Sequence, residues 1–271
     1  MANISLLRKD NYMLDYRILR YDTLESTNQK AKECAESLGH KDVIVAKEQT
    51  AGRGRMGRTW ISRKGADLIM SLVLKPKLPT NILSQVTLLM AMAVCDGLEN
   101  AVAEYNNCDI CENISGDKLP LIKWPNDVVI LSKKVCGILT ESVLMGDEVS
   151  QLIIGVGVNV GSEDFHLSIE NIAGSVKTQW GIDLDVDVLM EEILAAFDRY
   201  YEKFVENQSI DYMVEAYNNR LVSVDKEVLV GDRRGICRGI NSLGELMVEF
   251  DGIIENICAG EVSVRGLYGY V

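Results

Sequence analysis

The sequence predicts an α+β fold, in which a mixed or antiparallel sheet flanked by helices is followed by a small C-terminal β-barrel. Two observations lead to this prediction. Apolar, β-rich segments between residues 119 and 160 follow one another so closely that their strands are expected to pair antiparallel. After Leu221 the helical periodicity ends, and short strand-like segments separated by turn residues suit a barrel of about fifty residues. We therefore expect two domains, residues 1–221 and 222–271.

The first predicted helix follows Ser26 and Thr27, either of which could cap it, because apolar residues then recur at helical spacing. Two apolar segments, 42–46 and 67–74, are predicted to be strands. They enclose the basic stretch 50–60, which is therefore expected to be a loop between strands.

Three further helices are predicted from apolar residues that recur every three or four positions. They cover residues 81–104, 186–206 and 211–221. The segment 105–118 is polar, rich in turn residues and without periodicity, which indicates a surface loop.

Composition narrows the class of protein. The chain has 271 residues, 47% of them hydrophobic, which is enough for a substantial core. Its formal charge of −12 argues against nonspecific binding to nucleic acid or to an anionic membrane. Seven scattered cysteines favour a reducing compartment, and no secretory signal is visible. The apolar stretch 82–98 contains polar residues, so we expect a buried helix there and no membrane span.

The stretch TAGRGRMGRTW, residues 50–60, interleaves three glycines with three arginines and has no acidic residue. Glycine lets backbone N–H groups approach an anion closely, and the planar guanidinium suits phosphate oxygens. A solvated basic loop and a nucleic-acid-binding segment are the alternatives. The enclosing strands and the acidic remainder of the chain favour an anion-binding site.

The segment IIGVGVNVG, residues 153–161, contains Gly155 and Gly157 but has Val160 where the dinucleotide-binding fingerprint requires a third glycine. Close backbone packing and contact with a ligand both stay open as explanations of these glycines.

The segment IKWPNDVVI, residues 122–130, places polar residues at the end of an apolar strand, where binding sites are often found. Asp127 could hold Mg²⁺ or cap the turn. Lys134 is either a cation of the site or a solvated lysine at the start of a strand.

The cysteines and histidines of the sequence do not indicate a metal site or a hydrolytic site. Cys108 and Cys111 form a CxxC without a second cysteine or histidine pair, which argues against a zinc site. His40 and His166 lie near no serine or cysteine motif, which argues against a hydrolytic triad.

Several segments, taken together and in this order, resemble biotin protein ligases. They are STN at 26–28, QTAGRGRMGRTW at 49–60, KWPND at 123–127, KKVCGILTE at 133–141 and GVGVNV at 155–160. The C-terminal AGEVSVRG resembles the terminal barrel of that family, and the likeness runs from Tyr21 to Gly266. The resemblance implies a catalytic domain like that of class II synthetases and an SH3-like C-terminal barrel.

The resemblance also implies an activity, that of an ATP-dependent, AMP-forming biotin–[biotin carboxyl-carrier protein] ligase. Biotin and MgATP would give biotinyl-5′-AMP and pyrophosphate, and a lysine of the carrier domain of a biotin-dependent carboxylase would then take the biotinyl group. Such an enzyme is expected in the cytoplasm, and homodimers are common in the family.

The site residues implied by the resemblance fall into three sets. The catalytic set is Lys134, Arg55 and Asp127, with Asp127 as the Mg²⁺ ligand. The biotin-binding set is Ser26, Thr27, Asn28, Gln49, Gly52, Arg53, Arg55, Lys134 and Gly137. The set for ATP and the adenylate is Arg53, Arg55, Arg58, Trp60, Lys123, Asn126 and Asn159.

The sequence departs from the family pattern at two points. About twenty residues precede the similarity, too few for a winged helix-turn-helix, so we expect a short form that lacks the DNA-binding domain of the family's repressors and binds no DNA. Met56 replaces a frequently basic residue and leaves the glycine spacing intact. The alternatives are a lipoate protein ligase, whose Arg-Arg and consecutive-glycine signatures are absent, and a noncatalytic regulator that binds biotin or nucleotide.

Overall fold

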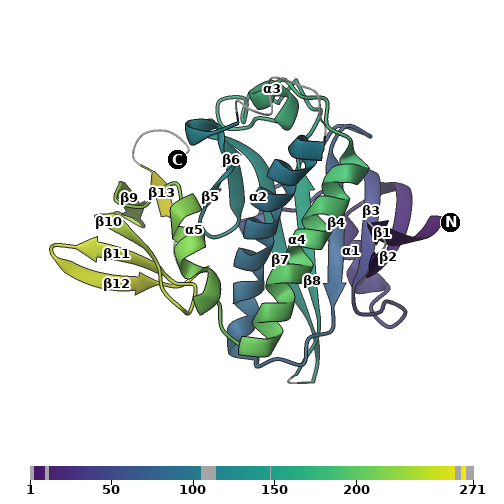
Figure 1. Ribbon diagram of the computed structural model, residues 1–271, viewed down its shortest axis with the longest axis horizontal. Helices are drawn as coiled ribbons and strands as arrows, with labels where there is room; N and C mark the ends of the chain where they lie inside the picture. The colour runs from purple at the N-terminus through teal and green to yellow at the C-terminus, as the bar shows by residue number, and fades with distance from the viewer. Residues whose placement is uncertain (1–2, 10–11, 105–113, 147, 260–263, 267–271) are drawn as a thin grey trace.

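The structure, a computed structural model, has one large sheet covered by helices and a smaller sheet near the C-terminus (Figure 1). It describes residues 3–9, 12–104, 114–146, 148–259 and 264–266. The predicted α+β class, with a mixed sheet and a small C-terminal β unit, is confirmed. Most of the predicted loop 105–118, including Cys108 and Cys111, lies outside the described residues.

The large sheet has eight strands in the order β1-β2-β3-β4-β8-β7-β6-β5. Its strands are β1 (Asn3–Lys9), β2 (Tyr12–Leu24), β3 (Asp42–Gln49), β4 (Leu68–Leu74), β5 (Leu121–Lys123), β6 (Asp127–Ile130), β7 (Lys133–Met145) and β8 (Glu148–Val158). Among them β2 and β3 pair parallel, and the other neighbours pair antiparallel. The antiparallel pairing predicted for the segments between residues 119 and 160 is therefore confirmed. Strands β1 and β2 were not predicted from the sequence.

Five α-helices and several short 3₁₀ turns are described. The helices are α1 (Thr27–Glu33), α2 (Val86–Glu104), α3 (Val176–Trp180), α4 (Val186–Asn207) and α5 (Val214–Arg220). Each predicted helix corresponds to one of these, with 3₁₀ turns at 80–85 and 211–213 leading into α2 and α5. Helix α3 was not predicted.

The two faces of the large sheet carry different helices, because successive residues of a strand point to opposite sides. Leu72 of β4 and Ile154 of β8 join the core formed with α2 and α4, which lie side by side in Figure 1. Val73 and Ile153, their neighbours in sequence, pack with Ala31 of α1 on the other face. We call this second side the α1 face.

Helix α2 explains the longest apolar stretch of the sequence. By length and composition alone, one segment of the described chain, Thr80–Ala103, could cross a membrane. The structure buries 72% of its most apolar window, against α4 and the large sheet. The prediction of a buried core helix is confirmed.

The C-terminal sheet is antiparallel, in the strand order β12-β11-β10-β9-β13. Its strands are β9 (Glu227–Val230), β10 (Arg233–Ile240), β11 (Leu246–Phe250), β12 (Ile253–Ile257) and β13 (Val264–Gly266). The turn between β10 and β11 contacts the segment that follows β5 of the large sheet. There the Gly244 carbonyl accepts a hydrogen bond of 3.0 Å from Trp124 Nε1.

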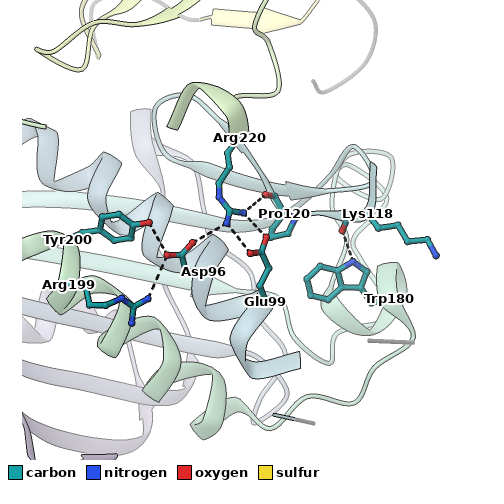
Figure 2. A network of polar contacts seen from close by, with 8 residues as sticks. All are labelled: Asp96, Glu99, Lys118, Pro120, Trp180, Arg199, Tyr200 and Arg220. Carbon is teal, nitrogen blue, oxygen red and sulfur yellow. Dashed lines mark hydrogen bonds and ion pairs between the residues drawn. The ribbon is translucent and has the colours of Figure 1, made fainter. Parts of the chain in front are cut away.

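A polar network joins α5, the helix that precedes this sheet, to the helices α2 and α4 that cover the large sheet (Figure 2). The Arg220 guanidinium contacts Glu99 at 2.6 Å and Asp96 at 3.1 Å, and its Nη1 also donates to the Pro120 carbonyl at 3.4 Å. The Tyr200 hydroxyl of α4 donates to Asp96 at 2.9 Å. One arginine therefore ties α5 to α2, and through Asp96 to α4.

Candidate active site

Helix α1 begins on the surface of the large sheet and brings polar residues there. The Ser26 hydroxyl caps the helix by accepting a hydrogen bond from the Gln29 backbone N–H. Thr27 and Asn28 follow in the first turn and are both 3% exposed. The Thr27 backbone N–H donates to Gln49 Oε1 at 2.7 Å. The buried STN segment is therefore joined by hydrogen bonds from Thr27 to the half-buried Gln49.

A cavity opens beside this group on the α1 face. Its described lining consists of Ser26, Thr27, Asn28, Gln49, Arg53, Gly54, Arg55, Trp60, Ile69, Met70, Asn126, Lys134, Gly137, Ile138, Leu139, Gly155, Val156 and Gly157. Among these residues three are cationic and none is acidic. In a protein of formal charge −12, this lining favours an anionic ligand that also carries an uncharged polar part.

The glycine- and arginine-rich stretch forms a short hairpin-like loop over the cavity. The Gly54 backbone N–H donates to the Arg58 carbonyl at 2.7 Å, and the Trp60 N–H donates to the Gly52 carbonyl at 3.0 Å. Met56 takes the left-handed conformation, with φ of 55°, at the tip. The prediction of a loop between strands is confirmed, since β3 precedes the stretch and β4 follows it.

Arg55 points from this loop into the site. Its Nη1 donates to Asn126 Oδ1 at 2.7 Å, which connects the glycine-rich loop to the KWPND segment 71 residues away. Burial lowers the pKa of Arg55, while the charge of Asp127 opposes that effect. A guanidinium that has already lost part of its hydration interacts more strongly with an anion than an exposed one does.

Lys134 and Asp127 form an ion pair of 2.6 Å at the start of β7 and β6. Asp127 is 8% exposed, and its Oδ1 also accepts a hydrogen bond of 3.1 Å from Asn126 Nδ2. The Lys134 ammonium lies 5.7 Å from the centre of the Trp60 ring. The lysine is thus fixed by a carboxylate and an aromatic ring while it lines the cavity.

The glycines of β7 and β8 make room for site side chains. A Cβ on Gly157 would lie 2.5 Å from Trp60 Cε2, and a Cβ on Gly137 would lie 2.9 Å from Trp60 Cζ3. A Cβ on Gly155 would lie 2.4 Å from Asn28 Oδ1. These glycines therefore belong to the site, because they let Trp60 and Asn28 lie directly on the sheet.

The comparisons with known proteins agree with this geometry. Residues 21–159 match the biotin/lipoate A/B protein ligase family. The chain is 33% identical over 258 residues to the bifunctional ligase/repressor BirA of Bacillus subtilis, which covers 93% of this chain and 75% of that protein. It is 28% identical over 249 residues to the biotin–[acetyl-CoA-carboxylase] ligase of Paracoccus denitrificans, at 89% and 98% coverage.

A solved structure gives the same result. The biotin protein ligase from Aquifex aeolicus, in complex with biotin and ATP, matches with a TM-score of 0.76 at 27% identity, over 92% of this chain and 98% of that one. The chain belongs to the biotin protein ligase family. The family and the enzyme class predicted from the motifs are therefore confirmed.

The structure brings together most of the residues that the biotin protein ligase resemblance implied. The predicted residues in the described lining are Ser26, Thr27, Asn28, Gln49, Arg53, Arg55, Trp60, Asn126, Lys134 and Gly137. They come from α1, the end of β3, the glycine-rich loop and the β6–β7 region. Residues more than a hundred positions apart thus share one cavity.

The other predicted residues lie next to this lining or away from it. Gly52 is buried behind the loop, where a Cβ would come within 2.4 Å of the Trp60 carbonyl. Asp127 is the partner of Lys134, and Lys123 is the register partner of Asp127 on β5. Arg58 is exposed. Asn159 is buried, and its Nδ2 donates to the Gly174 carbonyl at 2.9 Å.

Five apolar residues of the lining were not predicted. They are Ile69, Met70, Ile138, Leu139 and Val156. They lie on β4, β7 and β8, and nothing in their strand pattern distinguishes them from core residues. Gly54, Gly155 and Gly157 also line the cavity; the first lies in the predicted anion-binding loop, and contact with a ligand was one of the two explanations left open for the other two.

Proposed function

We propose that this protein activates biotin with ATP and then attaches the biotinyl group to a lysine of a biotin carboxyl carrier domain. One observation carries the proposal: uncharged hydrogen-bonding side chains from α1 and Gln49 share a cavity with the cations Arg53, Arg55 and Lys134. A cyclic urea suits the first set, and a carboxylate beside a phosphate suits the second. The biotin and ATP bound by the Aquifex aeolicus relative support this assignment.

In the first step, a carboxylate oxygen of biotin attacks the α-phosphorus of ATP. The bond from that phosphorus to the oxygen shared with the β-phosphate breaks, and pyrophosphate leaves. The reaction brings two anions together, so cations held in place lower its barrier. We assign this role to Lys134 and Arg55, with Arg53 beside them, and we assign to Asp127 the positioning of Lys134.

In the second step, the uncharged amine of the acceptor lysine attacks the acyl carbon of biotinyl-5′-AMP. The bond between that carbon and the phosphate oxygen breaks, AMP leaves, and the amine loses a proton to become an amide. The cations that stabilise the phosphate in the first step also stabilise AMP as the leaving group.

We propose that ATP enters as its magnesium complex, in which the metal neutralises phosphate charge. The part of the chain that the structure describes contains no cluster of three metal-binding side chains. Asp127 is buried and paired with Lys134. This donor set suits a metal held mainly by the nucleotide phosphates, with Asp127 as a protein ligand, which is how proteins commonly hold Mg²⁺.

The nucleotide is assigned to the side of the cavity formed by the glycine-rich loop and the KWPND segment. Arg58 and Lys123 would add positive charge around the phosphates, and Trp60 and Asn126, which line the cavity, would contact the adenylate. The buried amide of Asn159 would act through the Gly174 backbone that it holds.

We also propose a division into a catalytic domain, residues 1–221, and a C-terminal domain, residues 222–271. Their separate sheets support this boundary. A cytoplasmic location suits an enzyme that needs ATP and a carboxylase as acceptor. Among the described cysteines, Cys34, Cys95, Cys136 and Cys237 are free thiols, as in a reducing compartment.

Transfer of labelled biotin tests the proposal. The purified protein is mixed with MgATP, labelled biotin and a biotin carboxyl carrier domain, and the label should appear on the carrier. A carrier whose acceptor lysine is replaced by arginine should stay unlabelled. Pyrophosphate release driven by lipoate but not by biotin would favour a lipoate ligase, and release with neither acid would favour a noncatalytic regulator.

A further inference from the structure

Strand β7 departs from the regular alternation of side chains where Lys134 lies. Cys136 pairs with Val128 of β6, whereas Lys134 pairs with Val129. Val135 is therefore the extra residue of a β-bulge, and both Val135 and Cys136 join the core formed with α2 and α4. Lys134 lines the cavity, on the other face of the sheet. In a regular strand Lys134 would share the face of Cys136, two residues later, so the bulge is what turns its side chain to the cavity.

A short segment takes the place of β8 beside Lys134. Strand β8, which pairs with β7 farther along, ends at Val158. Beyond that end, the Lys134 backbone N–H donates to the Ile172 carbonyl at 2.7 Å, and the Lys134 carbonyl accepts from the Gly174 N–H at 2.9 Å. The two segments run parallel there. We call residues 170–174 the strap. Both backbone polar groups of Lys134 are therefore bound by the strap.

Lys133, the neighbour of Lys134, holds the strap by its side chain. Its ammonium donates to the Asn171 carbonyl at 2.7 Å and to the Glu170 carbonyl at 3.3 Å. A Cβ on Gly174 would lie 2.8 Å from Lys133 Cβ, so this glycine lets the strap pack against the stem of the lysine. Lys133 thus contacts the strap along its length.

Asn159 joins the end of the strap to the bulge. Its Nδ2 donates to the Gly174 carbonyl at 2.9 Å, and its backbone N–H donates to the carbonyl of Val135, the bulge residue, at 2.8 Å. Asn159 is buried, whereas Lys133 is partly exposed. Lys133 is therefore the contact of the strap that a substitution can remove without opening the interior.

We infer that Lys133 is a positioning residue for Lys134: by holding the strap against the bulge, it fixes the backbone from which the Lys134 ammonium reaches Asp127 and the cavity. The inference rests on the proposed function, in which Lys134 stabilises the reacting phosphate. A displaced backbone would move the ammonium, and a small misplacement of a catalytic group slows a reaction. Neither Lys133 nor the strap is in the described lining, so the effect is expected to pass through Lys134.

Two variants of Lys133 test this role. Lys133→Met keeps the stem and loses the donors, so the kcat of pyrophosphate release with biotin and MgATP should fall about three- to tenfold. Lys133→Arg keeps donors for the same carbonyls, and its kcat should stay within about twofold of wild type. Lys177→Met is the matched control, because Lys177 binds the same connection between β8 and α3 outside the strap, at Glu163, 3.0 Å away. It should keep the wild-type rate.

A double-mutant cycle shows whether Lys133 acts through Lys134. In Lys134→Ala the ammonium is absent, so adding Lys133→Met should change the rate by less than about twofold. Multiplied losses in the double variant would overturn the inference. The dissociation constant of biotinyl-5′-AMP with CH₂ in place of its acyl carbonyl gives a second cycle, which needs no turnover. This analogue keeps the phosphate assigned to Lys134, so the same pattern is expected.

The outcomes separate the inference from the proposed function. A wild-type protein that releases no pyrophosphate with biotin would overturn the proposed function, and the inference with it. With an active wild-type protein, the inference alone is overturned by a wild-type rate in Lys133→Met, or by an equal loss in Lys133→Arg or Lys177→Met. If Lys133→Met does not fold, Lys133→Gln carries the same test, because its shorter side chain ends before the two carbonyls.

Discussion

The ammonium of Lys134 lies 2.6 Å from Asp127 Oδ1, in an ion pair between the neighbouring strands β7 and β6. The space for this contact comes from Gly137, whose absent Cβ would lie 3.3 Å from Lys134 Nζ and 2.9 Å from the Trp60 ring. The lysine is thus held between a carboxylate and an indole, in a position where it also lines the cavity. A cation stabilises the charge on a reacting phosphate best when it is held in place before the reaction, and these contacts hold Lys134.

Removing this cation should slow adenylate formation. A charge-assisted contact felt in the transition state is worth roughly 1.5 to 3 kcal/mol, so Lys134→Ala should release pyrophosphate about ten- to more than a hundredfold more slowly than wild type. Lys47→Ala is the control, because Lys47 is exposed and lies outside the described lining. A Lys134→Ala enzyme with a near-wild-type rate would remove the residue from the mechanism.

The strand glycines give a second prediction. In Gly157→Ala the new Cβ would lie 2.5 Å from Trp60 Cε2, so the indole must move. Overpacking typically costs about 1–3 kcal/mol, and here the displaced ring also supports Lys134. We expect pyrophosphate release to fall at least about tenfold, since a small misplacement of a catalytic group costs that much or more. A changed tryptophan fluorescence spectrum would report the movement.

The matched control for this prediction is Gly39→Ala. The nearest atom to a Cβ there is 3.7 Å away, an ordinary contact, and Gly39 is not among the residues of the described lining. Wild-type activity in both alanine variants would contradict the assignment of Gly157 to the site.

The glycine-rich loop should be protected from trypsin by its substrates. Arg53 and Arg58 are exposed, whereas Arg55 is partly buried on Asn126. Without ligand, we expect cleavage after Arg58 and Arg53 before cleavage after Arg55. Biotin with MgATP should slow all three, because arginines bound to an anion are removed from solvent. Mass spectrometry of the early fragments measures the order, and equal cleavage with and without ligands would refute the closure of the loop.

Two buried tryptophans provide a matched pair of variants. Trp124 Nε1 donates to the Gly244 carbonyl and Trp180 Nε1 donates to the Lys118 carbonyl, both at 3.0 Å. Replacement by phenylalanine removes the donor in each case, so both variants should lose about 1–3 kcal/mol in the free energy of unfolding. Only Trp124→Phe should also slow adenylate formation, because Asn126, two residues later, holds Arg55. Urea unfolding and pyrophosphate release separate the two effects.

Local patterns in the sequence were enough to predict much of the fold. The Ser26 cap, the loop after β3 and the core helix α2 each depend on neighbouring residues, and each is found in the structure. The strands β1 and β2 were missed, and so was the role of Gly155, which depends on the side chain of Asn28, more than a hundred residues away. Such contacts between distant segments leave no periodic pattern within either segment.

The residues of the candidate site likewise divide into those that the sequence predicted and those that it did not. The motifs identified the polar and cationic residues, because chemistry restricts which residue types can bind an anion. They did not identify Ile69 or Leu139, since strand residues that line a cavity have the same apolar character as those of the core. Nor did they show that the amide of Asn159 is used within the fold, by the Gly174 carbonyl.

The stability of the protein should depend on pH through His40. His40 Nδ1 accepts a hydrogen bond of 3.0 Å from the Lys75 backbone N–H, which requires an unprotonated nitrogen. Burial, followed by the charge of Lys41, lowers the pKa of His40, and Asp198 opposes this only in part. Below the ordinary histidine pKa of 6.5, His40 is therefore protonated in the unfolded chain but still unprotonated in the folded protein. Proton binding to the unfolded chain lowers the free energy of unfolding. The contribution of His40 to stability is thus complete above pH 6.5 and decreases as the pH falls toward the lowered pKa of the folded state.

We therefore expect the free energy of unfolding to decrease from pH 7 to about pH 5.5, and to decrease less in His40→Gln, whose side chain can accept the same hydrogen bond without titrating. The His166→Gln variant is the control, since His166 is exposed and bonds only within its own turn among the described contacts. It should keep the wild-type dependence on pH. Urea unfolding at several pH values measures all three proteins, and an identical pH dependence in wild type and His40→Gln would show that His40 contributes nothing to it.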